Sequence, residues 1–158
     1  MIDVRRMAAL LAAAVGLTVA ANGSIAAESG SFSMMAVLNA SYESLQQNDV
    51  TAFAGPVAGP VAITKSTGDP FSVGSKGEVQ CLAYGKLTAN GISVEAVCSY
   101  SSDQGDLHMA NKRTGTTGTI TLLGGTGSYE GISGACEYTP ILVSTTASAT
   151  PVDCTWER

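Results

Sequence analysis

Apolar and polar residues alternate in short runs along most of the chain, and glycines separate these runs from about residue 77 onward. Alternation is typical of half-buried β-strands, whereas apolar residues three and four positions apart would indicate helices. The alternating runs predict strands at residues 77–87, 92–100, 107–111, 118–123, 129–138 and 152–157. Many antiparallel strands joined by short turns favour a barrel or a two-sheet sandwich. We therefore expect an all-β fold, a small antiparallel β-barrel of about eight strands.

The alternation is less regular nearer the N-terminus. Residues 40–48 are compatible with one or two turns of helix, and residues 34–38 with the start of a strand. Residues 54–62 read AGPVAGPVA and contain Pro56 and Pro60. Proline donates no backbone hydrogen bond, so we place residues 54–62 in a Pro/Gly loop or at a sheet edge.

A charged and then apolar segment opens the chain. Arg5 and Arg6 precede an apolar run over residues 7–21, and the small residues Ser24 and Ala26 follow it. This order is typical of a secretory signal peptide. The run is also shorter than the roughly 20 apolar residues that a bilayer-spanning helix needs.

The chain therefore divides into two parts. We predict a signal peptide at residues 1–26, cleaved near Ala26, and a single β-barrel domain at residues 27–158. The domain is expected to be exported, either to the periplasm or outside the cell, and to have no stable membrane span. Paired arginines also occur in twin-arginine signals, so the general secretory route and the twin-arginine route both stay open.

Composition and charge exclude two classes of protein. Hydrophobic residues make up 45% of the chain, charged residues 13%, and the formal net charge is −5. Intrinsic disorder requires little apolar content and a high net charge. A nucleic-acid-binding surface requires clustered Lys and Arg, and the chain has 8 in all. We therefore expect a folded domain that does not bind nucleic acid.

All four cysteines follow the predicted signal peptide. An even number of cysteines in an exported chain indicates disulfides, and four cysteines allow three connectivities. Their spacing suggests local pairs across hairpins, Cys81 with Cys98 and Cys136 with Cys154. A zinc site would instead need close cysteine pairs or several histidines, and His108 is the single histidine. We therefore predict two disulfides, no metal site and no cofactor.

The first pairing depends on the register of one hairpin. An Asn-Gly pair at residues 90–91 between two alternating runs is a strong hairpin signal. Cys81 faces Cys98 if residues 89–91 form a three-residue loop and Gly85 sits at a one-residue bulge. We predict that geometry.

Polar residues suited to catalysis are sparse. No G-x-S-x-G sequence accompanies His108, so a serine triad is not expected. Asp103 and Asp106 share a turn, where a capped turn is favoured over a calcium site that would need more oxygen ligands. Glu130 and Glu137 fall in predicted strands, where outward charges keep a sheet soluble. We predict no catalytic residue.

The most distinctive sequence is GGTGSYEGISG at residues 124–134. It resembles the G-G-T-G-x-[FY]-x-G-x-x-G hairpin of the allene oxide cyclase and dirigent superfamily of β-barrels and of small exported bacterial proteins related to them. Its glycines permit positive φ angles and close backbone approach. The matching residues are Gly124, Gly125, Thr126, Gly127, Tyr129, Gly131 and Gly134. The resemblance covers roughly residues 64–158.

The resemblance implies a scaffold that positions a ligand. Allene oxide cyclases steer ring closure of a fatty-acid epoxide inside an apolar barrel, dirigent proteins orient phenoxy radicals, and both tend to be trimers. The polar residues on which those activities depend have no match that we can assign here. We therefore expect binding of a small apolar ligand or a structural role in the cell envelope, in a protein that is a homotrimer by resemblance.

Two other functions stay open at this point. An isomerase or cyclase acting in the barrel interior would need an enclosed apolar cavity that holds one or two desolvated polar groups. A structural protein would have an interior packed with side chains. A self-associating surface protein would expose an apolar face.

Overall fold

The structure, a computed structural model, describes residues 28–158, and the predicted signal peptide at residues 1–26 lies outside them. The described strands are β1 (Ser29–Ala40), β2 (Glu43–Gln47), β3 (Val50–Ser66), β4 (Lys76–Thr88), β5 (Gly91–Ser102), β6 (Gly105–Thr114), β7 (Thr117–Gly125), β8 (Ser133–Tyr138), β9 (Ile141–Leu142) and β10 (Ala147–Glu157). A short 3₁₀ turn, η1 (Gly127–Tyr129), precedes β8. No helix in this part of the chain is long and apolar enough to cross a membrane.

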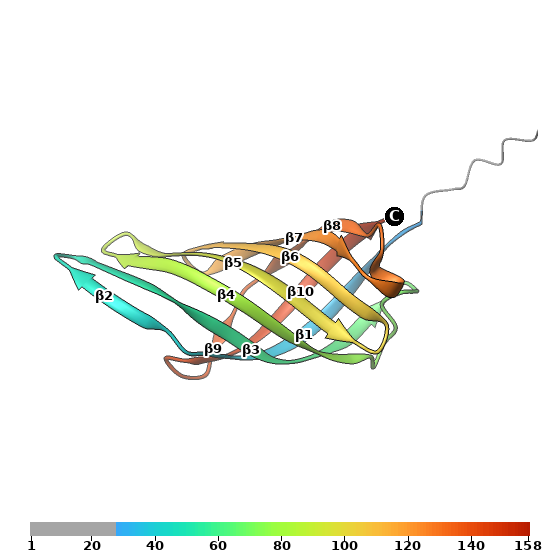
Figure 1. The fold of residues 1–158 in the computed structure, drawn as a ribbon, viewed down its shortest axis with the longest axis horizontal. Coiled ribbons are helices and arrows are strands. Elements are labelled where there is room, and N and C mark those ends of the chain that lie inside the picture. Colours follow the sequence, from blue (N-terminus) through green and yellow to red (C-terminus); the bar gives the residue numbers. More distant parts are fainter. Residues whose placement is uncertain (1–27) are drawn as a thin grey trace, which may run out of the picture.

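The strands form one antiparallel sheet that closes on itself. Neighbouring strands follow the order β1-β10-β8-β7-β6-β5-β4-β3, and the pairing of β1 with β3 completes an eight-stranded barrel (Figure 1). β2 pairs with β3 and β9 pairs with β10 at one end. This arrangement confirms the predicted all-β barrel.

The predicted loop at residues 54–62 is wrong, because these residues lie inside β3 and pair along their length with β4. The missing N–H of Pro56 destabilises the sheet little, because it faces away from β4. Its carbonyl accepts a hydrogen bond from the Ser41 N–H at 2.9 Å, so its missing N–H faces the bend between β1 and β2. A Cβ on Gly59 would lie 2.0 Å from the Val37 carbonyl oxygen. Glycine at this position therefore lets β1 and β3 approach closely enough to close the barrel.

The helical option for residues 40–48 is also wrong. Ser44 pairs with Phe53 across the β2–β3 ladder, and the whole of β2 is exposed. A ladder with β3 supplies the backbone hydrogen bonds that a short isolated helix would have to form alone. Residues 34–38 belong to β1, as one of the two alternatives predicted.

The hairpin of β4 and β5 has the predicted cysteine pairing but a different turn. Thr88 faces Gly91, whose φ is +108°, and the ladder continues without a bulge to Cys81 opposite Cys98. The expected bulge at Gly85 is therefore wrong, because the turn begins one residue earlier than Asn-Gly suggested. Gly85 serves instead to make room, since a Cβ there would lie 2.7 Å from the Phe53 ring.

Both predicted disulfides are formed. The Cys81–Cys98 bond joins β4 to β5, and the Cys136–Cys154 bond joins β8 to β10. Each joins directly opposite residues in neighbouring strands, so each fixes the register of one ladder.

Aromatic side chains fill one end of the barrel, which we call the closed end. Phe71, in the loop between β3 and β4, stacks on Phe32 with ring centroids 3.8 Å apart. Its ring also lies 5.5 Å from that of Tyr129 and 5.9 Å from that of Trp156. All four side chains are buried. The opposite end, where β2 and β9 lie, is called the mouth.

Candidate functional site

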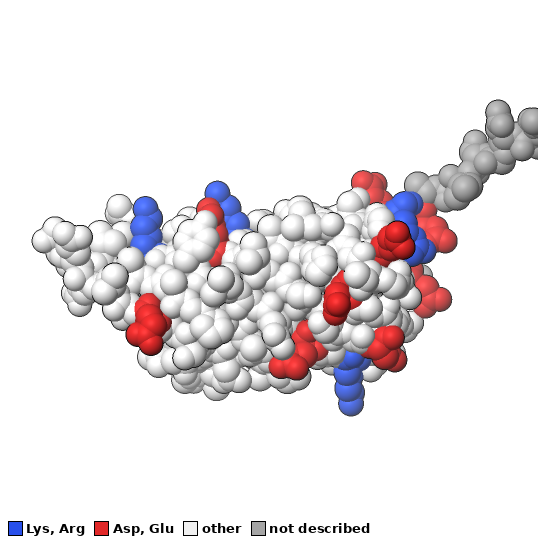
Figure 2. All heavy atoms as spheres, viewed as in Figure 1, with Lys and Arg blue, Asp and Glu red and all other residues white. Residues whose placement is uncertain are grey.

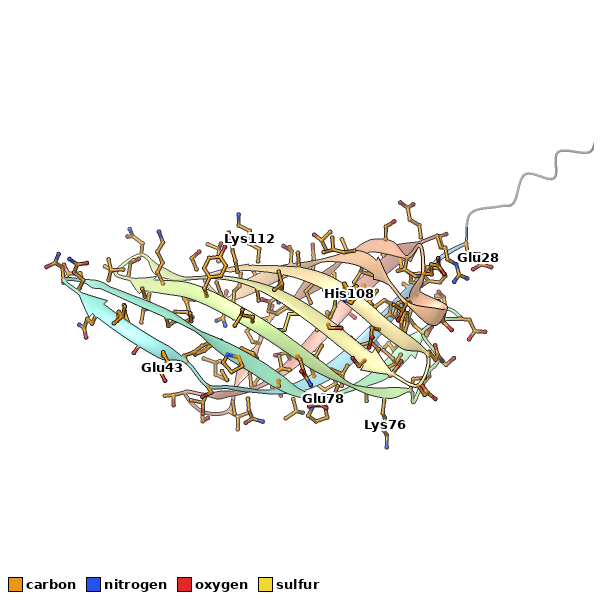
Figure 3. The ribbon with its side chains drawn as sticks, viewed as in Figure 1. Glu28, Glu43, Lys76, Glu78, His108 and Lys112 are labelled. Atoms are coloured by element: carbon orange, nitrogen blue, oxygen red, sulfur yellow. A yellow bond between two sulfur atoms is a disulfide. The ribbon has the colours of Figure 1, made fainter. Side chains whose placement is uncertain are left out.

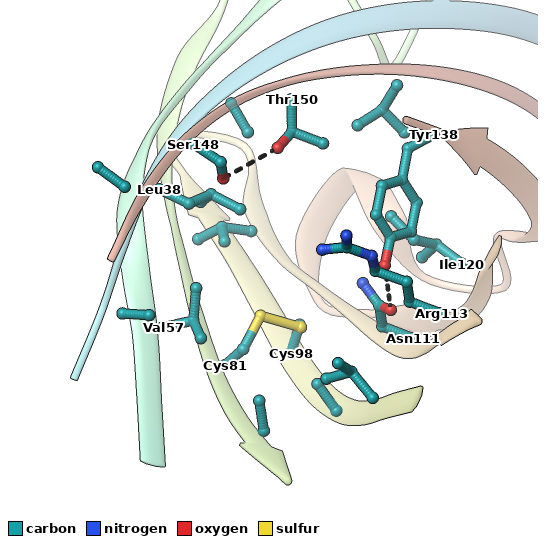
Figure 4. Close-up of a pocket in the computed structure, with 18 of the residues that line it drawn as sticks. Leu38, Val57, Cys81, Cys98, Asn111, Arg113, Ile120, Tyr138, Ser148 and Thr150 are labelled. Carbon is teal, nitrogen blue, oxygen red and sulfur yellow. Dashed lines mark hydrogen bonds between the residues drawn. A yellow bond between two sulfur atoms is a disulfide. The ribbon is translucent and has the colours of Figure 1, made fainter. Parts of the chain in front are cut away.

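An apolar cavity of about 360 Å³ occupies the barrel between the aromatic side chains of the closed end and the mouth (Figure 4). Its walls include Met34, Val61, Val79, Met109, Ile120 and Val152. These residues come from six different strands. Each occupies an inward position in the two-residue period of its strand, because successive side chains point to opposite faces.

β6 carries the lining from apolar to polar toward the mouth. Its inward positions are Leu107, Met109, Asn111 and Arg113, in order from the closed end. Leu107 and Met109 are buried in the core, whereas Asn111 and Arg113 line the cavity near its opening. One strand therefore places a neutral amide and a cation in a mainly apolar space.

Tyr138 and Asn111 form a polar pair inside the cavity. The Tyr138 hydroxyl donates a hydrogen bond of 2.7 Å to the Asn111 side-chain oxygen (Figure 4). Burial raises the pKa of the Tyr138 phenol, and the charge of Arg113 opposes that rise in pKa. Gly118 leaves space for the tyrosine ring, since a Cβ there would lie 2.2 Å from it. The phenol is therefore protonated at neutral pH and acts as a donor.

Arg113 brings a positive charge to the cavity. Its Nε donates to the Gly115 carbonyl at 2.9 Å, and its guanidinium points toward the cavity (Figure 4). Between residues 28 and 158, no carboxylate lies within ion-pair distance of it. Burial raises the pKa of the nearby Tyr42 phenol, and the Arg113 charge lowers that pKa in part. The guanidinium is therefore available to a hydrogen-bond acceptor on a ligand.

A second polar spot lies on the β10 wall. The Ser148 and Thr150 hydroxyls share a hydrogen bond of 3.2 Å, and Thr150 is buried (Figure 4). Both residues line the cavity. The cavity is thus mainly apolar with two polar spots, the arrangement that gives small-molecule sites their specificity.

The glycine-rich hairpin lies at the closed end, away from the cavity. The Thr126 hydroxyl accepts a 3.0 Å hydrogen bond from the Asp106 N–H, and the buried Tyr129 shares one of 3.0 Å with Ser102. The strand predicted at residues 129–138 begins at Ser133, because η1 and a turn come first. None of the seven motif residues lines the cavity. In this structure the motif seals one end of the barrel.

The cysteines divide between cavity and core. Cys81 and Cys98 form part of the cavity wall, so one predicted disulfide belongs to the site (Figure 4). Cys136 and Cys154 are buried in the hydrophobic core.

The charged residues considered for catalysis lie outside the cavity. His108, Glu130 and Glu137 are exposed, and His108 lies outside the barrel wall on β6 (Figure 3). Asp103 lies in the turn between β5 and β6, and Asp106 follows at the start of β6. The part of the chain that the structure describes contains no group of three His, Cys, Asp or Glu residues placed to hold a metal ion.

The polar residues of the cavity were missed by sequence reasoning. Asn111 was taken as the last residue of its strand, although the two-residue alternation from Leu107 continues to Arg113. Extending that alternation would have placed Arg113 inside the barrel. Tyr138 gave no such signal, because its partner Asn111 lies two strands away in the sheet order.

The fold and the cavity define a class, the closed eight-stranded antiparallel barrels with an apolar interior that is open at one end. Among solved structures, the chain is similar to the pterocarpan synthase dirigent protein GePTS1, with a TM-score of 0.51 and 12% sequence identity over 84% of each chain. The protein therefore has a dirigent-like barrel fold. No protein-family model matches the chain, and no curated protein matches it.

Proposed function

We propose that the protein binds a small, largely apolar ligand inside the barrel, with a polar group of the ligand near the mouth. The observation that carries this proposal is the cavity of about 360 Å³, because a structural role alone would be served by a packed interior. This volume lies within the roughly 300–1,000 Å³ of typical small-molecule sites.

The polar residues of the cavity indicate where the polar group of the ligand binds. A partly buried guanidinium is costly to desolvate without a partner, and a charge-assisted hydrogen bond offsets that cost. Arg113 has no carboxylate partner within the described chain, and the side-chain NH2 of Asn111, whose oxygen accepts from Tyr138, is a second donor in the cavity. The ligand therefore carries an acceptor, such as a carbonyl or carboxylate oxygen, at its end nearest the mouth.

A cavity-filling variant tests the proposal. Ala96 lines the cavity and is buried. Ala110 is the control position, because it pairs with the exposed Val97 on the outer face of the barrel. Titration with an environment-sensitive apolar fluorophore should give saturable binding to the wild type and to Ala110→Phe. Ala96→Phe should weaken binding at least about tenfold, a change of ~1.4 kcal/mol. Equal affinity of the two variants would place the probe outside the barrel.

A second candidate function is an isomerase or cyclase that acts in the cavity. The Tyr138–Asn111 pair supports it, because such an enzyme needs a few desolvated polar groups in an apolar space. The dirigent protein that shares the fold is described as a pterocarpan synthase. Tyr138→Phe separates the two functions. If the protein is only a binder, Tyr138→Phe should lower its affinity for the ligand at most modestly. If it is an enzyme, Tyr138→Phe should still bind the ligand isolated from the host but should no longer convert it.

Export and wider relationships are also part of the proposal. Two formed disulfides support an oxidising compartment, which fits a periplasmic or extracellular protein. The relation to allene oxide cyclases and small exported bacterial proteins is supported by the hairpin at residues 124–134. N-terminal sequencing of the protein from its own host should find a chain that begins near residue 27, and a chain that begins at Met1 would contradict cleavage.

A homotrimer is the proposed assembly. Exposed Leu82 and Val97 face each other across β4 and β5 on the outer wall, and exposed apolar side chains of this kind suit an interface. Light scattering at several concentrations should give a mass three times that of the chain, and a constant monomer mass would contradict the assembly. Unlimited growth in mass would instead support a self-associating surface protein.

A further inference from the structure

Large exposed apolar side chains surround the mouth of the barrel. They lie on two lobes. The first, which we call the flap, is formed by β2 and the adjoining ends of β3, β4 and β5, and it extends beyond the rest of the barrel (Figure 1). The second is the β9 hairpin, which runs from β9 into the start of β10. The apolar residues of the mouth rim are Leu45, Val50 and Leu87 on the flap and Ile141, Leu142 and Val143 on the β9 hairpin.

The mouth rim is continuous with the cavity. Phe53 and Ile92 of the flap and Leu142 of the β9 hairpin all belong to the cavity lining. The opening therefore lies between the two lobes, and apolar surface runs from the rim to the interior. Leu45 is 80% exposed and Val143 is 71% exposed, so nothing within the described residues covers them. Such exposure costs solubility unless a partner covers it.

Charge is distributed unequally between the two ends. Figure 2 shows most acidic side chains of the visible face over the closed half of the molecule. Glu78 lies near the start of β4, Asp106 lies near the start of β6 and Glu157 ends β10, all at the closed end. The flap carries Glu43 at the start of β2 and Asp49 in the β2–β3 turn as well as Lys86, and Arg113 lies at the mouth, so opposite charges are nearly balanced there. A negatively charged surface would therefore repel the closed end more strongly than the mouth.

We propose that the mouth rim docks on the surface of a lipid bilayer, so that the cavity opens into the membrane. The two lobes insert their apolar side chains at the boundary of headgroups and acyl chains, and Lys86 lies at the level of the headgroups. Anionic lipids repel the acidic closed end and so orient it away from the bilayer. The apolar ligand then moves between bilayer and barrel without crossing water, a step that rests on the proposed function.

A bilayer fits this surface better than a second protein. The rim is divided between two separate lobes, and a rigid partner would have to match both at once. A protein seated on both lobes would also cover the cavity opening between them. A fluid bilayer adapts to uneven lobes and supplies an apolar phase into which a ligand can pass.

Vesicle flotation with the exported, oxidised protein tests the docking. Wild type should float with phosphatidylcholine vesicles, because the contact is mainly apolar, and phosphatidylglycerol should not be required. Val143→Asp and Leu45→Asp should each reduce the floated fraction several-fold. Two matched controls, Val73→Asp in the β3–β4 loop and Leu123→Asp on β7, change residues that are 63% and 60% exposed and should float like wild type.

The remaining outcomes overturn the proposal. Wild type that stays with the soluble fraction contradicts docking, as does equal flotation of Val143→Asp and Val73→Asp. A rim variant that converts a larger assembly into monomers shows instead that the rim joins copies of the chain. Fluorophore binding in solution is the separate readout, because neither Val143 nor Leu45 lines the cavity. Loss of flotation with unchanged probe binding confirms docking, and a wild type that floats but binds no probe contradicts only the proposed function.

Discussion

Two buried tyrosines at the closed end differ by one hydrogen bond. The Tyr129 hydroxyl is bonded to Ser102 at 3.0 Å, whereas the Tyr100 hydroxyl is buried with no partner among the described residues. Burial, together with nearby Tyr129, raises the pKa of Tyr100 from 10.0 to about 12. An unpartnered buried hydroxyl destabilises a fold, and ionising it destabilises the fold further.

Phenylalanine at each position should therefore have opposite effects. At neutral pH, Tyr100→Phe should leave the free energy of unfolding unchanged or raise it, whereas Tyr129→Phe should lower it by about 0.5–1.5 kcal/mol. The stability due to neutral Tyr100 is complete below pH 10 and is lost as the pH rises from 10 to about 12. Denaturant titrations between pH 7 and pH 12 should show a smaller alkaline loss in Tyr100→Phe. Identical alkaline profiles in wild type and Tyr100→Phe would show that Tyr100 is not buried as described.

Arg113 should select for acidic ligands. Arg113→Gln should weaken binding of an apolar probe that carries a carboxylate by about ten- to a hundredfold, since hydrogen bonds to charged groups are worth ~1.5–3 kcal/mol. Binding of the uncharged amide of the same probe should change little. Lys112→Gln is the matched control, because the neighbouring Lys112 side chain points away from the barrel (Figure 3). Equal effects of the two substitutions in calorimetric titrations would indicate a general charge effect.

At the scale of elements, the sequence predicted the strands of the C-terminal half well. The alternation of apolar and polar residues located the regions of β4 to β8 and β10, and the predicted cysteine pairs indicated which strands are neighbours in two of the ladders. β3 was missed because the expectation that proline disrupts a sheet considers the proline alone and not its neighbours in the sheet. Whether Pro56 disrupts a sheet depends on which neighbour its nitrogen faces, and that neighbour is the distant bend at Ser41. β2 was missed because its partner strand, not its own pattern, makes it a strand.

The two disulfides should differ in reactivity. Cys81–Cys98 lines the open cavity, whereas Cys136 and Cys154 are buried in the core. A small thiol reductant should therefore reduce the first bond in the folded protein and the second only on unfolding. Alkylation followed by peptide mass mapping should find this order. Loss of each bond should lower the free energy of unfolding by about 3 kcal/mol. Simultaneous reduction of both bonds in the folded state would contradict the open cavity.

At the scale of the whole molecule, the barrel has two unlike ends. The aromatic side chains and the glycine-rich hairpin seal the closed end, and the mouth opens between the flap and the β9 hairpin. The resemblance at residues 124–134 pointed to the barrel, and the structure places these residues at its sealed end. The cavity could not be predicted from the sequence, because its volume depends on side chains from all eight strands. Small residues such as Ala83 and Ala96 leave it open, and they pack next to partners that no local pattern identifies.

The central claim is that the barrel interior is an open apolar site, and methionine methyl groups report on it directly. Met34 and Met109 line the cavity, whereas Met35 is exposed on the outer face, and residues 28–158 contain no other methionine. In NMR spectra of protein with ¹³C-labelled methionine methyls, titration with a small apolar compound should shift the Met34 and Met109 signals saturably and leave Met35 in place. A shift of Met35 alone, or of none of the three, would contradict the account.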